Sequence, residues 1–264
     1  MGSYYFLAGL LPDLEVGHPP SLPYPQLRGL FHSHLSAKDY QKFVTLRLYV
    51  DIDNLRSFWL GGGHFDSFDP RGNFNQKELE EALFWEQELP EYVVNFIHDH
   101  ERPADKLKHF PKLVNQYFRE EIEKQTGFLR EYLTFEREWR LVLLGFRAKV
   151  LGRDLSAELQ FEDPFDPIIH QIMAQKDAKA YEPPAKYEEL KHVFESHKDD
   201  PLALHKALCH FCFNRIERMV DQEIFSIDRI LAFVVQLAIV EKWQELDEEE
   251  GRLIVDTIVK ENII

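Results

Sequence analysis

The sequence predicts an all-α protein. Apolar residues recur at about 3.6-residue spacing over long stretches, several of which begin with a capping residue or a proline. Alternating β-branched runs bounded by tight hairpin turns are nearly absent. The most informative stretch is residues 225–246, where Ser226 can cap the first turn and Asp228 lies at the positive end of the helix dipole. Apolar side chains occupy nearly every face of this helix, so we expect it to be buried on several sides within a bundle.

Helices are expected at about residues 4–11, 27–34, 38–58, 75–88, 112–124, 135–151, 167–177, 201–222 and 225–246. Pro12 ends the first of them, and a proline-rich loop at 16–25 separates it from the second. The third helix has a candidate break near residues 51–53. It is followed by a glycine-containing loop at 61–72.

Capping residues mark several of the later helix starts. Asn75 followed by Glu78 resembles a capping box. Asp166 and Asp200 each precede a proline, which pairs an N-cap with proline at the first helical position. Amphipathic spacing defines the helices between these points, and the two prolines at 183–184 predict a kinked linker.

Composition limits the classes of function. The chain has 264 residues, of which 44% are hydrophobic and 29% charged, as is ordinary for a globular protein of one or two domains. Its 31 Lys and Arg against 46 Asp and Glu give a formal net charge of −15. This charge disfavours nucleic acid and anionic lipid, and it would attract a basic protein partner. No secretory signal, membrane span or disulfide framework is predicted, so we expect a cytoplasmic protein.

One group of residues suggests metal chemistry. His205, Cys209 and Cys212 follow one another at spacings of four and three residues, which on a helix could turn three soft ligands toward one zinc ion. A structural zinc site normally has a fourth ligand, and no second cysteine pair supplies one. The neighbours of the group, which also includes His210, are apolar, and such surroundings suit cysteines buried as small apolar residues. The sequence leaves both interpretations open.

Other chemical signatures are weaker. The two histidines of residues 98–101 point in different directions on a helix, as do His32 and His34, and all four are predicted to lie on the surface. The glycines at 61–63 lack the Lys-Ser/Thr of a phosphate loop, and no Gly-x-Ser-x-Gly motif is present. The acidic run at 245–250 is expected to solvate a helix end or to face a basic partner. We therefore predict no catalytic, cofactor-binding or metal-binding residues, and no cofactor.

A faint internal echo suggests repeated bundles. An acidic residue and an arginine occur together at residues 51–56, 136–140 and 225–229, each expected at the head of an apolar helix. The intervals of roughly 85 to 90 residues exceed the usual solenoid period. The same pattern is also expected simply because acidic residues favour a helix N-terminus.

Four segments carry a family resemblance. They are residues 227–233, with the sequence Ile-Asp-Arg-Ile-Leu-Ala-Phe, the aromatic opening at 4–11, Asp-Asn-Leu-Arg at 53–56, and Phe-Arg-Ala-Lys with a later glycine at 146–152. They resemble the central-stalk C/d subunit of V-type (vacuolar and archaeal-type) rotary ATPases. The head of the chain, residues 1–12, is similar to a shorter bacterial family of unassigned function that is encoded with V-type ATPase subunits.

The resemblance implies a single funnel-like domain over residues 1–264, built of pseudo-repeated helical bundles at roughly 1–95, 96–180 and 181–264. It implies a non-catalytic subunit that couples the central rotor shaft to the membrane ring of a V-type ATP synthase. The expected partners are rotor-shaft subunits and the membrane rotor ring, with no nucleic acid and no direct insertion into lipid. Such a subunit is cytoplasmic and reaches the membrane through its complex. The alternatives are a helical scaffold or adaptor in an unrelated complex and a metal-dependent enzyme built on the His/Cys group.

Overall fold

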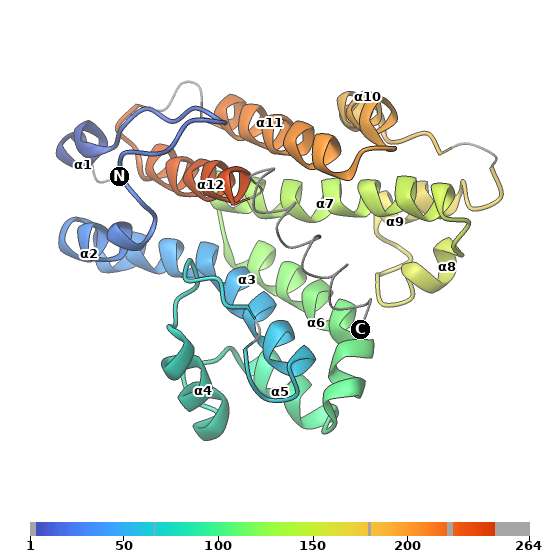
Figure 1. Ribbon diagram of the computed structural model, residues 1–264, viewed down its shortest axis with the longest axis horizontal. Coiled ribbons are helices and arrows are strands. Elements are labelled where there is room, and N and C mark those ends of the chain that lie inside the picture. Colours follow the sequence, from blue (N-terminus) through green and yellow to red (C-terminus); the bar gives the residue numbers. More distant parts are fainter. Residues whose placement is uncertain (1–3, 66, 179–180, 221–223, 246–264) are drawn as a thin grey trace, which may run out of the picture. The chain divides into compact units, whose positions relative to one another are not determined.

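Helices are the only regular elements in the part of the chain that the structure describes. The computed structural model describes residues 4–65, 67–178, 181–220 and 224–245 (Figure 1). In chain order the elements are α1 (Tyr5–Leu10), α2 (Pro25–His34), α3 (Ala37–Leu60), α4 (Gln76–Trp85), α5 (Glu91–Asp99), α6 (Pro103–Lys124), α7 (Gly127–Val150), α8 (Leu155–Glu158), α9 (Pro167–Met173), the 3₁₀ turn η1 (Ala185–Tyr187), α10 (Glu188–His197), α11 (Pro201–Met219) and α12 (Ile227–Gln244). The predicted all-α class is confirmed. None of these helices has both the length and the apolar character needed to cross a bilayer.

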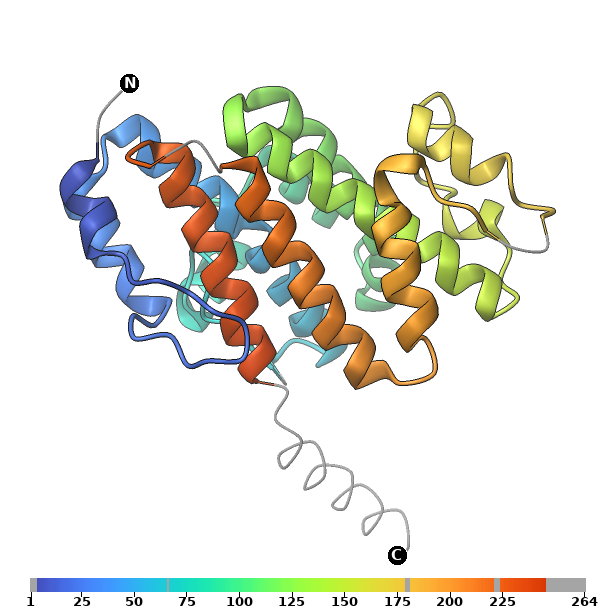
Figure 2. The ribbon, with the colours of Figure 1, turned by 90° about the horizontal axis from the view of Figure 1, so that it is seen from above.

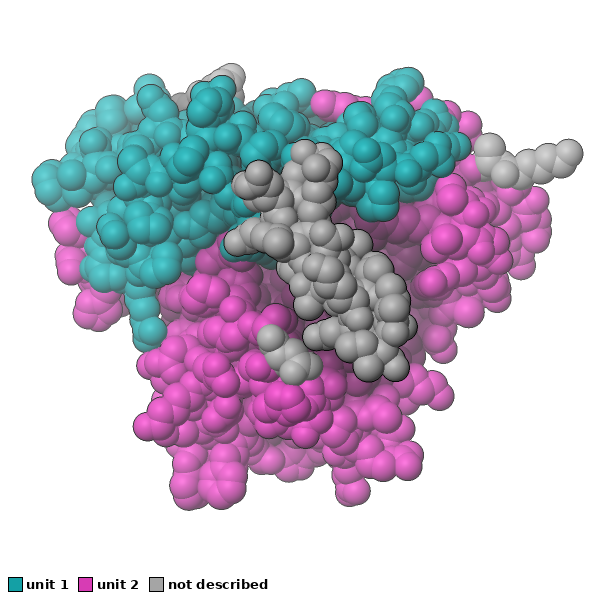
Figure 3. Space-filling model, viewed as in Figure 1, with its two compact units in different colours: residues 1–30, 192–264 teal, residues 31–191 magenta. Residues whose placement is uncertain are grey.

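The chain divides into two compact units (Figure 3). Unit 1 consists of residues 1–30 and 192–264, and unit 2 consists of residues 31–191. The first and last parts of the sequence therefore belong to the same unit. The smaller bundles expected with boundaries near residues 95 and 180, and the funnel-like single domain, stay predictions.

In unit 1, α11 and α12 lie side by side (Figures 1 and 2). The Ser226 hydroxyl accepts a hydrogen bond from the backbone N–H of Arg229 at 3.2 Å and so caps α12 as expected. The buried residues of α12 are Ile230, Leu231, Ala232, Phe233, Val234, Val235, Gln236, Leu237 and Val240. Because they fall on all faces of the helix, the prediction of burial on several sides is confirmed. Gln236 donates from Nε2 to Glu217 Oε2 of α11 at 3.0 Å, which satisfies its buried amide. Of the acidic run at 245–250, only the first residue lies in the described part of the chain.

In unit 2, α6 contacts α3, α5 and α7, while α8 and α9 pack on α7. Aromatic side chains fill much of the core where these helices meet. Tyr117 is buried on α6, and its ring lies 5.6 Å from that of Tyr49 on α3, measured between centroids. The guanidinium of Arg140 on α7 lies 4.5 Å from the centroid of the Tyr49 ring. Three helices are thus joined through one aromatic contact group, which adds ring–ring and cation–π attraction to burial.

α3 is more regular than expected. It is continuous over Ala37–Leu60, so the break considered near residues 51–53 is absent. Neither glycine nor proline occurs there, and the Asp51 carboxylate bonds to a neighbouring loop instead of competing for its own helix backbone. The acidic residues and arginine at 51–56 therefore lie inside the helix and not at its head.

α6 and α7 both begin earlier than expected. α6 begins at Pro103 and contains Pro111, which in the sequence suggests a boundary. α7 begins at Gly127, so residues 136–140 lie well inside it. Of the three groups that made up the internal echo, only residues 225–229 begin a helix. The echo is therefore not a repeated helix start.

Helix starts with a capping residue match the prediction. Asn75 Oδ1 accepts from the backbone N–H of Glu78 at 2.9 Å, and Glu78 Oε2 accepts from that of Asn75 at 2.8 Å. Asp166 and Asp200 cap α9 and α11. The three helices concerned end earlier than expected. No predicted helix range corresponds to α5, α8 or α10.

Candidate functional site

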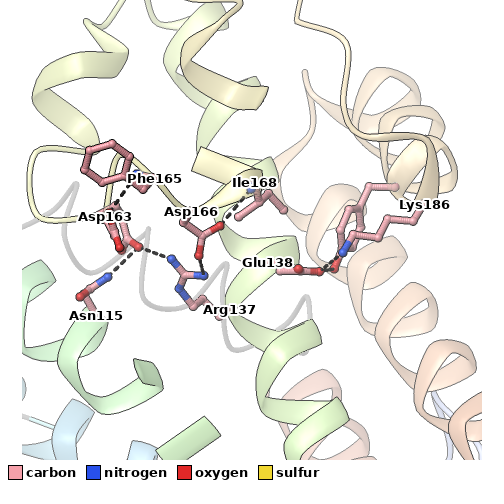
Figure 4. Close-up of polar contacts among 10 residues, drawn as sticks. Asn115, Arg137, Glu138, Asp163, Phe165, Asp166, Ile168 and Lys186 are labelled. Atoms are coloured by element: carbon pink, nitrogen blue, oxygen red, sulfur yellow. Dashed lines mark hydrogen bonds and ion pairs between the residues drawn. The ribbon is translucent and has the colours of Figure 1, made fainter. Parts of the chain in front are cut away.

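A half-buried ion-pair cluster in unit 2 joins α6, α7 and the segment before α9 (Figure 4). Arg137 of α7 donates from Nη2 to Glu162 Oε2 at 2.6 Å and from Nη1 to Asp166 Oδ2 at 2.7 Å. Asn115 of α6 donates from Nδ2 to the same Glu162 oxygen at 2.6 Å. The other carboxylate oxygen of Asp166 accepts from the backbone N–H of Ile168 and caps α9. The Arg137 clasp is defined as Asn115, Arg137, Glu162 and Asp166.

The Arg137 clasp is a closed set of charges. The side chains of Arg137, Glu162 and Asp166 are 15%, 13% and 25% exposed. Burial lowers the pKa of the Arg137 guanidinium, but hydrogen bonds and charges from Glu162 and Asp166 outweigh burial and raise that pKa above its usual value. An arginine held as a cation between two carboxylates orients the elements that carry them. It provides neither a proton donor near neutral pH nor a nucleophile.

The next residue of α7 makes a second contact of this kind. Glu138 Oε2 accepts from Lys186 Nζ at 2.5 Å and from the hydroxyl of the buried Tyr187 at 2.8 Å (Figure 4). The η1 turn, which follows the prolines at 183–184, is thereby attached to α7. The predicted linker is anchored at this point by one buried ring and one charge-assisted hydrogen bond.

A second polar cluster holds the loop between α3 and α4. Asp51 is 1% exposed, and its Oδ1 accepts from the backbone N–H groups of Asn73 at 2.7 Å and Phe74 at 3.3 Å. Its Oδ2 accepts from Asn73 Nδ2 at 2.7 Å. Desolvation raises the pKa of the Asp51 carboxyl to about 6, although these hydrogen bonds and the charge of Arg47 act in the opposite direction.

The same loop is held at two further points. Asn54 pairs with the backbone of Asp69: its Oδ1 accepts from the Asp69 N–H and its Nδ2 donates to the Asp69 carbonyl, both at 2.9 Å. Arg47 donates to the carbonyl oxygens of Arg71 and Gly72. The Asp51 clasp is defined as Arg47, Asp51, Asn54 and Asn73. It satisfies backbone groups of a loop that has no regular structure of its own.

Sequence reasoning did not find either clasp. It named Asp51 and Arg137 only as members of the internal echo, and Asp166 only as a helix cap. Of residues 53–56, Asp53 and Arg56 are exposed and Asn54 bonds to the loop. One signal was present in the sequence. Asp51 and Asn54 are polar residues three positions apart beside buried apolar neighbours, and a long Gly/Asn/Asp-rich loop follows them. Such a loop needs side-chain partners for its backbone.

The His/Cys group of α11 brings two of its members together. Cys209 Sγ lies 3.4 Å from His205 Nε2, Cys209 and Cys212 are buried thiols, and His210 is exposed. Burial raises the pKa of the Cys209 thiol to about 11, as is usual for a thiol among apolar neighbours. Over residues 4–65, 67–178, 181–220 and 224–245, no group of three or more His, Cys, Asp or Glu side chains is placed to hold a metal ion.

Most of the remaining candidate histidines lie on the surface, as predicted. His32, His34 and His98 are exposed. His100 is half-buried and stacks on His109 of α6, with ring centroids 4.3 Å apart and an interplanar angle of 9°. Burial and the neighbouring His109 lower the pKa of His100. The stack therefore attaches the end of α5 to α6 as a packing contact.

Large apolar side chains are exposed around α1 in unit 1. Tyr5, Phe6 and Leu10 are 64%, 65% and 47% exposed. The Tyr5 ring lies against that of Phe225, with centroids 4.4 Å apart, and Ile224 beside it is also exposed. The α1 patch is defined as Tyr5, Phe6, Leu10, Ile224 and Phe225. Clustered exposed apolar side chains of this size are typical of protein-binding surfaces.

Comparison with known proteins identifies the family. The family described as "Protein of unknown function (DUF2764)" matches residues 1–262. The chain belongs to this family. Similar relatives are uncharacterised proteins of Chlamydia trachomatis (29% identical), Chlamydia muridarum (27%) and Chlamydia pneumoniae (29%), and in each case 98% of this chain and 98% of the relative are covered. No solved structure matches.

Membership of the V-type ATPase C/d family is therefore a wrong prediction. The family that matches nearly the whole chain has no assigned function, and no V-type ATPase subunit family matches. The fold accounts for two of the four segments that suggested it. Residues 230–233 are apolar because α12 is buried on several sides, and residues 53–56 supply Asn54 to the Asp51 clasp. Both are requirements that many buried helices share.

Proposed function

We propose that this chain is a non-catalytic subunit of a larger protein assembly, with a V-type rotary ATPase as the first assembly to test. The observation that carries the proposal is the α1 patch. Leu7 is buried and anchors α1, while the two aromatic side chains that precede it, Tyr5 and Phe6, are exposed. A helix of six residues cannot bury such side chains on its own. A partner surface that covers them removes this apolar area from water.

Backbone contacts support the view that the α1 patch is preformed. The Tyr4 N–H donates to the Phe225 carbonyl at 2.9 Å, which joins the start of α1 to the segment before α12. Side chains held in place before binding lose less conformational entropy when a partner docks. Aromatic side chains at such a position are also the ones that most often dominate binding energy.

The likeness of the aromatic opening, residues 4–11, to stalk subunits is the reason to test the V-type ATPase first. Coupling of the rotor shaft to the membrane ring is the finer form of the same proposal, and membership of the C/d family is not part of it. In that assembly the chain would work in the cytoplasm and reach the membrane through its partners. The alternative is a helical scaffold or adaptor in an unrelated complex, with which the match to a family of unknown function is equally compatible.

The test is recovery of the tagged full-length chain from its native host after cross-linking, with mass spectrometry directed at the host's V-type ATPase subunits. We expect stalk or ring subunits with the wild type, and their loss with the double variant Tyr5→Ser/Phe6→Ser. Leu60→Ser, which removes an exposed apolar side chain of unit 2, is the matched control and should retain them. Recovery of other stoichiometric partners through the same patch would select the scaffold alternative. Recovery of the chain alone would overturn both.

A further inference from the structure

Unit 2 carries a second exposed aromatic surface at the end of α4. Phe84 and Trp85 are 75% and 64% exposed, and their rings meet edge to face with centroids 4.7 Å apart. The helix packs through Leu79 and Ala82, which are buried. The last two residues of α4 thus extend beyond its packed face into solvent. An exposed Phe–Trp pair is unusual for a helix end, where polar residues are the norm.

Carboxylates flank this aromatic pair along the chain. Glu80 and Glu81 lie one turn before Phe84 on the same side of α4, and residues 76–91 contain six glutamates against one lysine, a net charge of −5. The exposed carboxylates are Glu80, Glu81, Glu86, Glu88 and Glu91. The Nζ atom of Lys77 lies 3.5 Å from Oε1 of Glu81, and this one pair leaves the excess of negative charge in place. The surface therefore combines two apolar rings with an acidic rim.

The backbone after Trp85 fixes the position of the pair. Glu86 and Glu88 have φ values of 53° and 65°, in the left-handed region that side-chain-bearing residues seldom adopt. Glu86 ends α4 there, and its carboxylate lies 2.8 Å from His98 Nε2 on α5. The next helix starts directly after Pro90. The two rings are thus presented from a short, defined turn between two helices of the same unit.

We propose that this Phe84–Trp85 surface binds a basic amphipathic segment of another protein. Charge selects this occupant. Nucleic acid, an anionic membrane and a second copy of a chain with net charge −15 are all repelled by the acidic rim. Lysine and arginine side chains match the rim and are attracted to the faces of both rings, and the apolar side of the segment covers their edges. Its residues differ from those of the α1 patch, so the proposal holds for either assembly considered above.

The test uses the full chain and a fluorescein-labelled peptide of ~18 residues that carries Leu and Lys on opposite faces of a helix. We expect saturable binding by fluorescence anisotropy, weakened about tenfold or more by Trp85→Ala and by the double variant Glu80→Gln/Glu81→Gln. Phe165→Ala, which removes another fully solvated ring of unit 2, should leave the Kd within about twofold. A copy of the peptide with Glu in place of Lys should not bind.

A second readout separates this site from unspecific attraction. The indole N–H resonance of Trp85, assigned by its loss in Trp85→Ala, should shift when the Lys peptide is added. Absence of saturable binding, or equal affinity of the wild type and Trp85→Ala, would overturn the proposal. Self-association or binding to anionic vesicles that depends on Trp85 would also overturn the proposal. Either result would show that the surface binds something other than a basic segment of another protein.

Discussion

At Asp51, burial and hydrogen bonding compete over one carboxyl group, and burial prevails. Its pKa is about 6 in the folded chain against an ordinary value of 3.8. The folded state therefore binds this proton more tightly than the unfolded state does. This proton adds about 3 kcal/mol to the free energy of unfolding. The contribution is fully present below about pH 4 and is lost as the pH rises through about 6.

The measurement is the free energy of urea unfolding of wild type and Asp51→Asn across this pH range. The variant is expected to be less stable at every pH, since its amide places a donor opposite Asn73 Nδ2. The wild type alone should lose stability between about pH 4 and 6 relative to the variant. Asp53→Asn, at an exposed position two residues later, is the control and should follow the wild type. Parallel curves for wild type and Asp51→Asn would contradict the raised pKa.

Loss of Arg137 would leave two carboxylates without their cation. In Arg137→Met, Glu162 and Asp166 stay largely buried and lose their cation, so we expect a loss of about 3 kcal/mol or more in unfolding free energy. Arg153 forms a more exposed pair with Glu158, and Arg153→Met should cost less than about 1 kcal/mol. Similar losses for the two variants by denaturant unfolding would show that the Arg137 clasp does not stabilise unit 2.

At the scale of elements, Gly145 allows α7 to pack closely against Tyr181 in the chain that follows it. A Cβ atom added at Gly145 would lie 2.9 Å from two ring atoms of Tyr181, which is buried. Gly145→Ala should therefore destabilise the protein by about 1–3 kcal/mol through overpacking, although alanine is the better helix former. At Gly29 of α2 an added Cβ meets nothing within 4 Å, so Gly29→Ala should be neutral or stabilising by up to about 1 kcal/mol. Thermal unfolding of both variants checks this, and a stabilised Gly145→Ala would refute the close contact.

The helix starts that were predicted correctly are those with a local chemical cause. Asn75 with Glu78, Asp166, Asp200 and Ser226 all cap helices through bonds to backbone N–H groups within three residues. The errors concern features that packing decides. Helices α6 and α7 extend beyond their predicted starts because their contacts within unit 2 outweigh weak local signals such as Pro111.

Neither clasp follows from local sequence, because each joins residues far apart in the chain. Arg137 meets Glu162 and Asp166 only when α7 and the start of α9 are brought together, and no periodicity specifies which arginine will be buried. The Asp51 clasp spans α3 and the loop that follows it, and its partners in the loop are mostly backbone groups. Exposed aromatic residues are equally hard to foresee, since Phe84 and Trp85 read as core residues in the sequence.

At the scale of the whole molecule, the fold class followed from helical periodicity, whereas the family did not follow from short matching segments. The all-helical build and the net charge of −15 apply to many unrelated proteins. Only particular surfaces of the molecule therefore point to a function. The α1 patch carries the proposed role in an assembly, and the Phe84–Trp85 surface carries the proposed choice of partner.

The most direct test of the assembly role is the native mass of the complex that holds the chain in extracts of its host. The monomer has a mass of 31.3 kDa. We predict that the wild-type chain elutes in a species well above that mass, and that Tyr5→Ser/Phe6→Ser shifts it to the monomer position without unfolding it. A wild-type chain that elutes as a 31.3 kDa monomer at its native concentration would contradict the account.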